Sequence, residues 1–139
     1  MARIELMDWK RARDLASPIR FEVFVREQRV PAEIELDEHD AACLHALAFE
    51  GEEAIGTGRL LPDGHIGRMA VLKAWRGRGV GGMILKELVQ AAGRRGDREV
   101  ALSAQVHAVD FYRAHGFSPV GEVYQEAGIA HEAMVRSLA

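Results

Sequence analysis

The chain has 139 residues, 48% hydrophobic and 28% charged, a balance typical of one soluble globular domain with a substantial core. Its formal net charge of −3 excludes a general electrostatic attraction to nucleic acid, so no nucleic-acid partner is expected. The single cysteine, Cys43, excludes an internal disulfide, and no apolar run is long enough to span a bilayer, so we expect a cytoplasmic protein with no membrane partner.

The first part of the chain is expected to contain a short strand followed by two helices. Residues 3–7 alternate polar and apolar side chains, which indicates a strand. Apolar residues recur at three- and four-residue spacing over 9–16, which indicates a short helix. Ser17 and Pro18 are residue types preferred at the N-cap and the first position of a helix, so we expect a second helix to begin there and to end before Pro31.

Residues 31–42 contain five acidic side chains and show little periodicity, so this segment is expected to be a loop. Its length suggests a role beyond connecting its neighbours. Two interpretations stay open. The segment is either a solvated connector or an acidic wall on a pocket that receives a cationic acceptor.

The central part of the chain predicts three neighbouring antiparallel strands and then a crossover. Residues 44–50, 54–61 and 65–71 are strand-like and are separated by short turns. The period changes to that of a helix over 80–93, and the mostly apolar segment 100–104 is typical of a buried parallel strand. The third strand of the meander, this helix and the parallel strand together predict a βαβ unit.

The chain is expected to end in a short helix and a hairpin. Residues 108–115 have a helical pattern, and 117–124 and 130–138 are strand-like on either side of a turn at 126–128. Residues 1–139 therefore predict a single domain of mixed α+β class. Its sheet combines an antiparallel meander, one βαβ crossover and a C-terminal hairpin, with helices on both faces.

The most informative stretch runs from Arg68 to Gly82, between the meander and the long helix. Four of the six positions 77–82 are glycine, so the backbone N–H groups there are unshielded by side chains and lead into a helix N-terminus. Arg76 and Arg78 add positive charge. This composition favours a phosphate or pyrophosphate site, and a flexible basic surface turn is the simpler alternative.

The glycines also match the pattern G-x-G-x-x-G at Gly77, Gly79 and Gly82, which is typical of dinucleotide binding. In that fold the first glycine directly follows a strand, whereas here residues 72–76 intervene and the preceding strands are antiparallel. A Walker A loop would need Gly-Lys-Ser/Thr at its end, which this loop lacks. A nucleotide-dependent oxidoreductase is therefore a weak alternative.

Two segments resemble sequence motifs of the GCN5-related N-acetyltransferase (GNAT) superfamily. Residues 76–81, Arg-Gly-Arg-Gly-Val-Gly, resemble its acetyl-CoA loop R/Q-x-x-G-x-G/A, and residues 111–117 resemble its F-Y-x-x-x-G-F segment. The order of the expected elements is also similar. Further segments resemble the ElaA/YjcF-like branch, so that the resemblance covers nearly the whole chain: residues 23–28, Glu35 and Asp37, 104–105, 128–131 and Met134.

The resemblance implies the GNAT acyl-CoA N-acyltransferase fold, with a V-shaped opening between the third meander strand and strand 100–104. A β-bulge near 69–71 would leave backbone groups free to bond the pantetheine arm of acetyl-CoA. The pyrophosphate would lie on the amides of 77–82, held by Arg76 or Arg78. The cofactor-binding residues so implied are Met69, Ala70, Val71, Arg76, Gly77, Arg78, Gly79, Val80, Gly81, Gly82 and Gln105.

The implied reaction is direct transfer of the acetyl group from acetyl-CoA to a primary amine, without a covalent enzyme intermediate. Tyr112 would protonate the leaving sulfur, and a backbone N–H near Val71 would stabilise the oxyanion. The strand before the loop carries no carboxylate, so the base stays open. Glu27 is the first candidate, and the others are a water chain and the side chains of Glu35, His39 and His107. The acceptor would be a small-molecule or peptide amine.

Three further expectations concern function, metals and assembly. A non-catalytic sensor that binds acyl-CoA is the alternative function, because it needs the same loop but not Tyr112. His39, Cys43 and His45 are three potential metal ligands without a nearby fourth, so no metal is expected. The terminal hairpin could pair across a dimer, so a homodimer is an alternative to the monomer.

Overall fold

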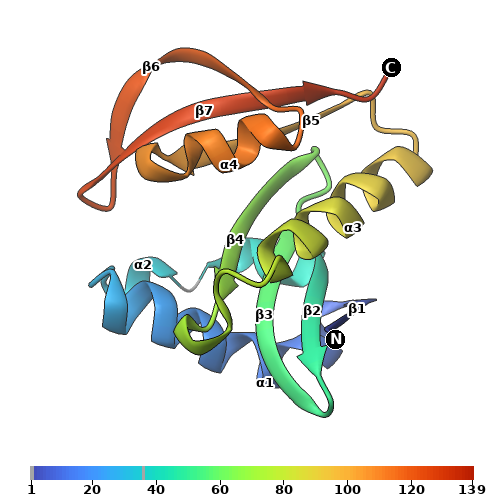
Figure 1. Ribbon diagram of the computed structural model, residues 1–139, viewed down its shortest axis with the longest axis vertical. Helices are drawn as coiled ribbons and strands as arrows, with labels where there is room; N and C mark the ends of the chain where they lie inside the picture. The colour runs from blue at the N-terminus through green and yellow to red at the C-terminus, as the bar shows by residue number, and fades with distance from the viewer. Residues whose placement is uncertain (1, 36) are drawn as a thin grey trace.

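The computed structural model describes residues 2–35 and 37–139, and the seven strands of this part form one mixed sheet (Figure 1). The strands are β1 (Arg3–Met7), β2 (Leu44–Glu50), β3 (Glu53–Leu60), β4 (His65–Val71), β5 (Glu99–Gln105), β6 (Ser118–Glu126) and β7 (Ile129–Ser137). The α-helices are α1 (Trp9–Arg20), α2 (Ala32–Glu35), α3 (Val80–Arg94) and α4 (Val109–Ala114). The chain also forms a π-helical segment, η1 (Phe21–Glu27), and the 3₁₀ segments η2 (Glu38–Ala42), η3 (Lys73–Trp75) and η4 (Val106–Ala108).

The strands follow the order β1-β2-β3-β4-β5-β7-β6 across the sheet. The strands β1 to β4 are antiparallel neighbours, and β4 and β5 are parallel across the α3 crossover. The hairpin strands β6 and β7 are antiparallel, and it is the later strand, β7, that pairs with β5. The predicted meander, βαβ unit and terminal hairpin are therefore confirmed. In Figure 1 the meander with α1 and the hairpin with α4 form two parts of the molecule with a gap between them.

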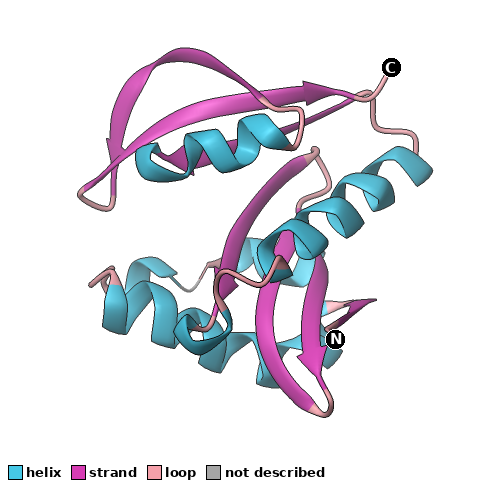
Figure 2. Ribbon diagram, in the orientation of Figure 1, coloured by secondary structure: helices cyan, strands magenta, loops and turns pink. Residues whose placement is uncertain are grey.

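Helices cover both faces of the meander (Figure 2). Successive residues of β2 show this, because Ala46 and Ala48 belong to the core cluster under α3, whereas Leu47 and Phe49 belong to the cluster under α1. Side chains of a strand alternate between the two faces of a sheet, so both faces of β2 are buried. The predicted placement of helices on both faces is confirmed.

The helix α3 packs closest to the sheet at two glycines of β3. A Cβ atom on Gly56 would lie 3.0 Å from Ile84 Cδ1, and one on Gly58 would lie 2.9 Å from Ile84 Cγ2 and 3.0 Å from Leu88 Cδ1. A side chain at either position would have to displace the Ile84 or Leu88 side chain of α3. These contacts fix the position of α3, and with it the loop at its N-terminus.

The N-terminal helical region is continuous, and the prediction of two separate helices is wrong. Asp8 caps α1 by accepting a hydrogen bond from a first-turn N–H, and the helix runs through Pro18, where a new helix was expected to begin. Four buried positions continue at helical spacing across the proline: Ala12, Ala16, Ile19 and Arg20. Their packing against the sheet outweighs the one backbone hydrogen bond that a proline cannot donate.

Residues 31–42, predicted to be a loop, include the short helices α2 and η2. The Asp37 side chain caps η2 by accepting a hydrogen bond from the His39 N–H at 3.0 Å. The acidic side chains that reduced the hydrophobic periodicity thus act as a cap and as partners of buried arginines. Within residues 2–35 and 37–139, no helix is long and apolar enough to cross a bilayer.

Candidate functional site: a cleft between β4 and β5

The strands β4 and β5 separate soon after they begin to pair, and a cleft opens between them. Their parallel register contains two residue pairs, His65 with Ala101 and Ile66 with Leu102. Beyond these pairs β4 diverges from β5 (Figure 1). Residues of both strands line a cleft with a volume of about 1090 Å³. The structure therefore has the V-shaped opening that the resemblance implied, and its size suits an extended ligand.

A β-bulge in β4 shapes one wall of this cleft. The register with β3 passes from Thr57–Ala70 to Arg59–Gly67, so β4 contains one residue more than β3 over this interval. Arg68 lies in the bulge with a φ of 48°, a left-handed conformation that residues with a side chain rarely adopt. The expected bulge is present, and it begins one residue before the expected range.

Backbone groups of Val71 face the cleft rather than β3. The next amide, Leu72 N–H, donates to Ile55 O of β3 at 2.9 Å, and successive amides of a strand point to opposite edges. On the cleft side the Val71 carbonyl accepts a hydrogen bond from Arg76 Nε at 2.9 Å. The N–H of Val71 points to the same edge, where an extended ligand can pair with it.

The loop after β4 leads directly into the N-terminus of α3. Gly77 and Gly79 have φ angles of 76° and 81°, and a Cβ atom on either would meet nothing within 4 Å. Gly79 is the N-cap of α3, and no side chain in the described part of the chain caps this helix, so its first N–H groups remain for another acceptor. The glycines at 77, 79, 81 and 82 all line the cleft. Amide donors and the positive end of the helix dipole therefore face the cleft.

The two arginines of the loop are held in different ways. Arg76 forms a bidentate ion pair with Glu27 of η1, in which both N–O distances are 2.9 Å. The exposed Arg78 places its guanidinium over the Trp75 ring, 5.0 Å from the centroid. Arg76 lines the cleft, whereas Glu27 and Arg78 are not among the described residues that line it. The structure thus pairs the first candidate base, Glu27, with one of the two arginines expected to hold phosphate.

Tyr112 and Gln105 lie on the other wall of the cleft. The Tyr112 hydroxyl is 4.0 Å from Met69 Sδ of β4, and the ring centroid is 6.1 Å from that of Phe117 in an edge-on contact. Burial raises the pKa of Tyr112 to about 12, so its hydroxyl is protonated at neutral pH. The Gln105 amide exchanges hydrogen bonds of 2.9 and 3.5 Å with Gln28, the C-cap of η1. This pair joins β5 to η1 at the edge of the cleft.

The other three candidate bases, Glu35, His39 and His107, all line the cleft. Glu35 is 5% exposed, and its carboxylate binds the Arg20 guanidinium. The carboxylate of Glu35 is therefore already engaged by a cationic partner behind the wall of the cleft.

The three potential metal ligands make other contacts. Cys43 Sγ donates to His39 O at 3.1 Å, and His45 Nε2 lies 2.9 Å from Asp40 O. Burial lowers the pKa of His45, so its ring is neutral at physiological pH. Among residues 2–35 and 37–139, no three His, Cys, Asp or Glu side chains are grouped so as to hold a metal ion.

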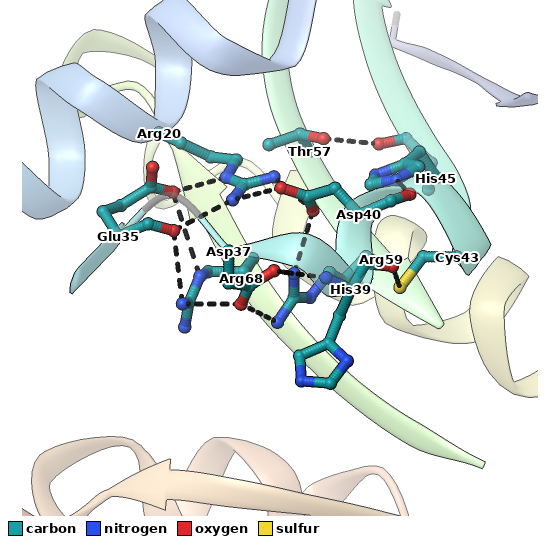
Figure 3. A network of polar contacts seen from close by, with 11 residues as sticks. Arg20, Glu35, Asp37, His39, Asp40, Cys43, His45, Thr57, Arg59 and Arg68 are labelled. Atoms are coloured by element: carbon teal, nitrogen blue, oxygen red, sulfur yellow. Dashed lines mark hydrogen bonds and ion pairs between the residues drawn. The ribbon is translucent and has the colours of Figure 1, made fainter. Parts of the chain in front are cut away.

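A network of three arginines and three carboxylates lies beside the cleft (Figure 3). Its members are Arg20, Glu35, Asp37, Asp40, Arg59 and Arg68. At its deepest point Arg20, only 1% exposed, binds Asp40 through two hydrogen bonds of 2.8 and 3.1 Å and also binds the Glu35 carboxylate. Three of the five acids in residues 31–42 are therefore paired with arginine, and neither a solvated connector nor a free acidic wall describes them.

Arg59 and Arg68 form the side of this arginine network that is nearest the cleft, and both line it. Arg59 binds Asp37 through two hydrogen bonds of 2.8 and 2.9 Å and Asp40 through one of 2.9 Å. Arg68 Nη2 donates to Asp37 Oδ2 at 3.1 Å and to the Glu35 carbonyl at 3.2 Å. With 28% of its side chain exposed, Arg68 is the most exposed of the six members.

The charges of the network shift its pKa values in opposite directions. Hydrogen bonds from Arg59 lower the pKa of Asp37 to about 2. Burial disfavours the charged form of Asp40, but hydrogen bonds from Arg20 and Arg59 outweigh it and the pKa of Asp40 is also lowered. Arg59 is buried too, yet the hydrogen bonds that it donates to its two carboxylate partners raise its pKa. Arg68 differs, because burial and the nearby positive charge of Arg59 lower its pKa.

One residue of the sequence points to this network, the arginine at a buried position of α1. Arg20 stands four and eight residues after the buried Ala16 and Ala12, on the buried face of α1. An arginine at a position typical of an apolar residue requires a buried anionic partner. Its partners lie 15 and 20 residues away in the acidic segment, and no local pattern links the two.

Comparison with known proteins agrees with this geometry. The family profile described as "Acetyltransferase (GNAT) domain" matches residues 12–138. The N-acetyltransferase YjcF of Bacillus subtilis is 43% identical over 122 residues, which cover 85% of this chain and 87% of YjcF. ElaA of Escherichia coli is 34% identical over 128 residues, which cover 86% of this chain and 84% of ElaA. The crystal structure of an acyl-CoA N-acyltransferase from Pseudomonas aeruginosa, 32% identical, superposes with a TM-score of 0.88 over 99% of this chain and 100% of that chain.

Proposed function

This chain belongs to the GNAT acetyltransferase family, and we propose that it transfers the acetyl group of acetyl-CoA to a primary amine by direct attack. The observation that carries the proposal is the early separation of β4 from β5, which leaves a bulged strand edge on one wall of a cleft. The glycine loop that leads into α3 continues the same wall. Together they offer backbone donors to an extended diamide and to a pyrophosphate.

The residues of this wall fit acetyl-CoA. The edge of β4 from Met69 to Val71 would pair with the pantetheine arm, and the open space at Gly77 and Gly79 admits a phosphate close to the backbone. Because Arg76 is held by Glu27, we assign it the role of positioning the loop against β4. Contact with phosphate oxygens then falls to the loop amides and to Arg78.

Acetyl-CoA supplies an activated thioester, and the chain supplies the groups around it. The amine nitrogen forms a bond to the acetyl carbon, the C–S bond breaks, and one proton moves overall from nitrogen to sulfur. The products are an N-acetyl amide and the free CoA thiol. The Val71 N–H is the proposed oxyanion donor. The Tyr112 hydroxyl keeps its proton at neutral pH and donates it toward the sulfur as negative charge develops there.

An acceptor that arrives as an ammonium ion must first release one further proton to become the neutral amine that attacks, and we assign this step to water in the cleft. His39 and His107 line the cleft and can hydrogen-bond such water. Glu27 is outside the lining and bound to Arg76, so its proposed role is to hold Arg76 in place. Through Arg76 it acts on the Val71 carbonyl, next to the proposed oxyanion donor.

The release of CoA from acetyl-CoA in the presence of a panel of primary amines tests this proposal. We expect release with at least one amine, and we expect Tyr112→Phe to lower kcat by about 10²- to 10⁴-fold while acetyl-CoA still binds in a calorimetric titration. The chain has one other tyrosine, so Tyr124→Phe is the matched control and should leave the rate unchanged. If the protein binds acetyl-CoA but no amine of the panel causes release of CoA, the result would instead identify a sensor.

A further inference from the structure

The wall of the cleft next to the bulge presents guanidinium groups rather than carboxylates. Arg68 lines the cleft, whereas Asp37, its ion-pair partner, is not among the described residues that do. Glu35 lines the cleft but is only 5% exposed and is bound to Arg20 behind it. Figure 3 shows the Asp37 and Asp40 side chains between arginines of the network. Two exposed carboxylates also line the cleft, Asp63 in the turn before β4 and Glu126 at the end of β6, but on the wall next to the bulge an acceptor would meet Arg68 before it met a carboxylate.

The negative charge of the network is committed mainly to the deeper arginines. Asp40 lies between Arg20 and Arg59, and Asp37 gives both of its oxygens to Arg59. Arg68 shares one of those oxygens at 3.1 Å, and its other carboxylate neighbour, Glu35, is 3.9 Å away. The pKa of Arg68 is lowered by burial and by Arg59, whereas hydrogen-bonded carboxylates raise that of Arg59 despite its burial. A carboxylate bound at Arg68 from the cleft would oppose both effects, because it would add a negative charge beside the guanidinium.

The backbone of Arg68 is also held in an unfavourable conformation. Its φ is 48°, although the preceding residue is a glycine that would adopt such an angle without strain. Strained residues of this kind are concentrated at binding sites, where the surrounding structure holds them in place. The bulge places Arg68 directly before Met69–Val71, two to three residues, or about 7–10 Å of extended chain, from the proposed position of the thioester.

We propose that the acceptor of this acetyltransferase is a small amino carboxylate, whose carboxylate pairs with Arg68 while its amine attacks the thioester. This inference rests on the proposed function, and it replaces the cationic acceptor that the acidic composition of residues 31–42 suggested. The short distance from Arg68 to the reacting end of the cleft favours a compact molecule that carries both groups. An acceptor with a second positive charge would instead face Arg59 and Arg68.

Matched pairs of amines test the proposal in the CoA-release assay. Each pair consists of an amino acid and its amide, such as β-alanine with β-alaninamide and 4-aminobutyrate with 4-aminobutyramide, compared at equal concentrations of free base. A diamine, 1,4-diaminobutane, represents the cationic acceptor. Since charge-assisted hydrogen bonds in a partly buried site discriminate by about 10- to 100-fold, we expect the acids to exceed their amides by that factor in kcat/KM.

Three variants separate binding of the carboxylate from a structural role of the ion pair. We expect Arg68→Gln to abolish the preference for acid over amide, and Arg68→Lys to restore part of it because the charge returns. Asp37→Asn breaks the same ion pair from the other side but keeps the guanidinium, so it should retain the preference. Thermal unfolding and an acetyl-CoA titration show for each variant that the fold and the cofactor site are intact.

The outcomes distinguish this proposal from the proposed function. Turnover of the amides or the diamine without a preference for the acids would overturn the carboxylate assignment and leave the acetyltransferase standing. An acid preference that survives in Arg68→Gln would also overturn the role of Arg68. If no CoA is released from acetyl-CoA with any of these amines, the amino acid amides included, both the proposed function and this inference are refuted.

Discussion

Replacement of Asp40 by asparagine removes the central negative charge of the arginine network. Asp40 is 2% exposed, binds Arg20 through two hydrogen bonds and accepts a third from Arg59. The asparagine amide has one acceptor oxygen and places N–H donors beside cationic donors. Removing one partner from a buried ion pair costs about 3–5 kcal/mol, because the remaining charge is left without compensation away from water. We expect Asp40→Asn to destabilise the protein by about this amount.

The expected fall in melting temperature follows from the size of the chain. At about 2.1 cal/mol/K per residue, a chain of 139 residues has an unfolding entropy of about 0.3 kcal/mol/K. A loss of about 3–5 kcal/mol then lowers the melting temperature by about 10–17 °C. The total stability of a domain is about 5–15 kcal/mol, so the variant should remain folded at low temperature and be measurable.

Urea unfolding followed by circular dichroism measures this effect, with Glu22→Gln as the matched control. Glu22 pairs with Arg26 on the surface at 3.5 Å, with side chains 46% and 67% exposed, and exposed pairs of this kind contribute at most about 0.5 kcal/mol. The slope m should be unchanged and the midpoint should shift strongly for Asp40→Asn alone. If Asp40→Asn shifts the midpoint as little as Glu22→Gln does, the network does not stabilise the fold as described.

Two further predictions concern the dependence of stability on pH and the close contact between β3 and α3. The folded-state pKa of Asp37, about 2, lies below its ordinary value of about 3.9, so the folded state binds fewer protons and the free energy of unfolding rises with pH in this window. The stabilisation by the ionised Asp37 carboxylate should be complete above about pH 4 and be lost as the pH falls toward about 2. Midpoints of urea unfolding that stay constant over this range would contradict the prediction. Gly58→Ala should cost about 1–3 kcal/mol, because its Cβ would lie 2.9 Å from Ile84 of α3. Gly93 lies in α3, and a Cβ atom there would meet nothing within 4 Å, so Gly93→Ala should instead stabilise the protein by up to about 1 kcal/mol. Equal effects of the two substitutions in urea unfolding would refute the close contact between β3 and α3 at Gly58.

The parts of the fold that were predictable are those with a local signal. The meander follows from alternating strands separated by short turns, and α3 follows from its period of apolar residues. The loop at 76–82 was recognisable because glycines there precede a helix, and two of them adopt positive φ. The pairing of β7 rather than β6 with β5 is not local, since it depends on which strand of the hairpin reaches the interior of the sheet.

The polar contacts of the site were not predictable because they join distant segments. Glu27 and Arg76 are 49 residues apart, and Gln28 and Gln105 are 77 apart. From the sequence, Glu27 is a candidate base because it is a carboxylate close to the expected site. Its ion pair with Arg76 appears only in the folded structure. The prediction that a helix begins at Pro18 is wrong for a related reason. Burial of Ala16 and Ile19, on either side of the proline, outweighs the preference of proline for the first position of a helix.

A calorimetric titration with acetyl-CoA shows whether the cleft beside β4 and the loop at 76–82 hold this molecule. Wild-type protein is compared with Gly79→Asp, which places a carboxylate where the pyrophosphate is expected, and with Gly51→Asp. Gly51 also has a positive φ, of 61°, and open space around it, but it lies in the turn between β2 and β3. We expect wild type and Gly51→Asp to bind acetyl-CoA equally and Gly79→Asp to bind at least about 100-fold more weakly, a loss of about 2.7 kcal/mol. Unchanged affinity in Gly79→Asp would refute pyrophosphate binding at this loop, and no binding by the wild type would refute the acetyl-CoA site altogether.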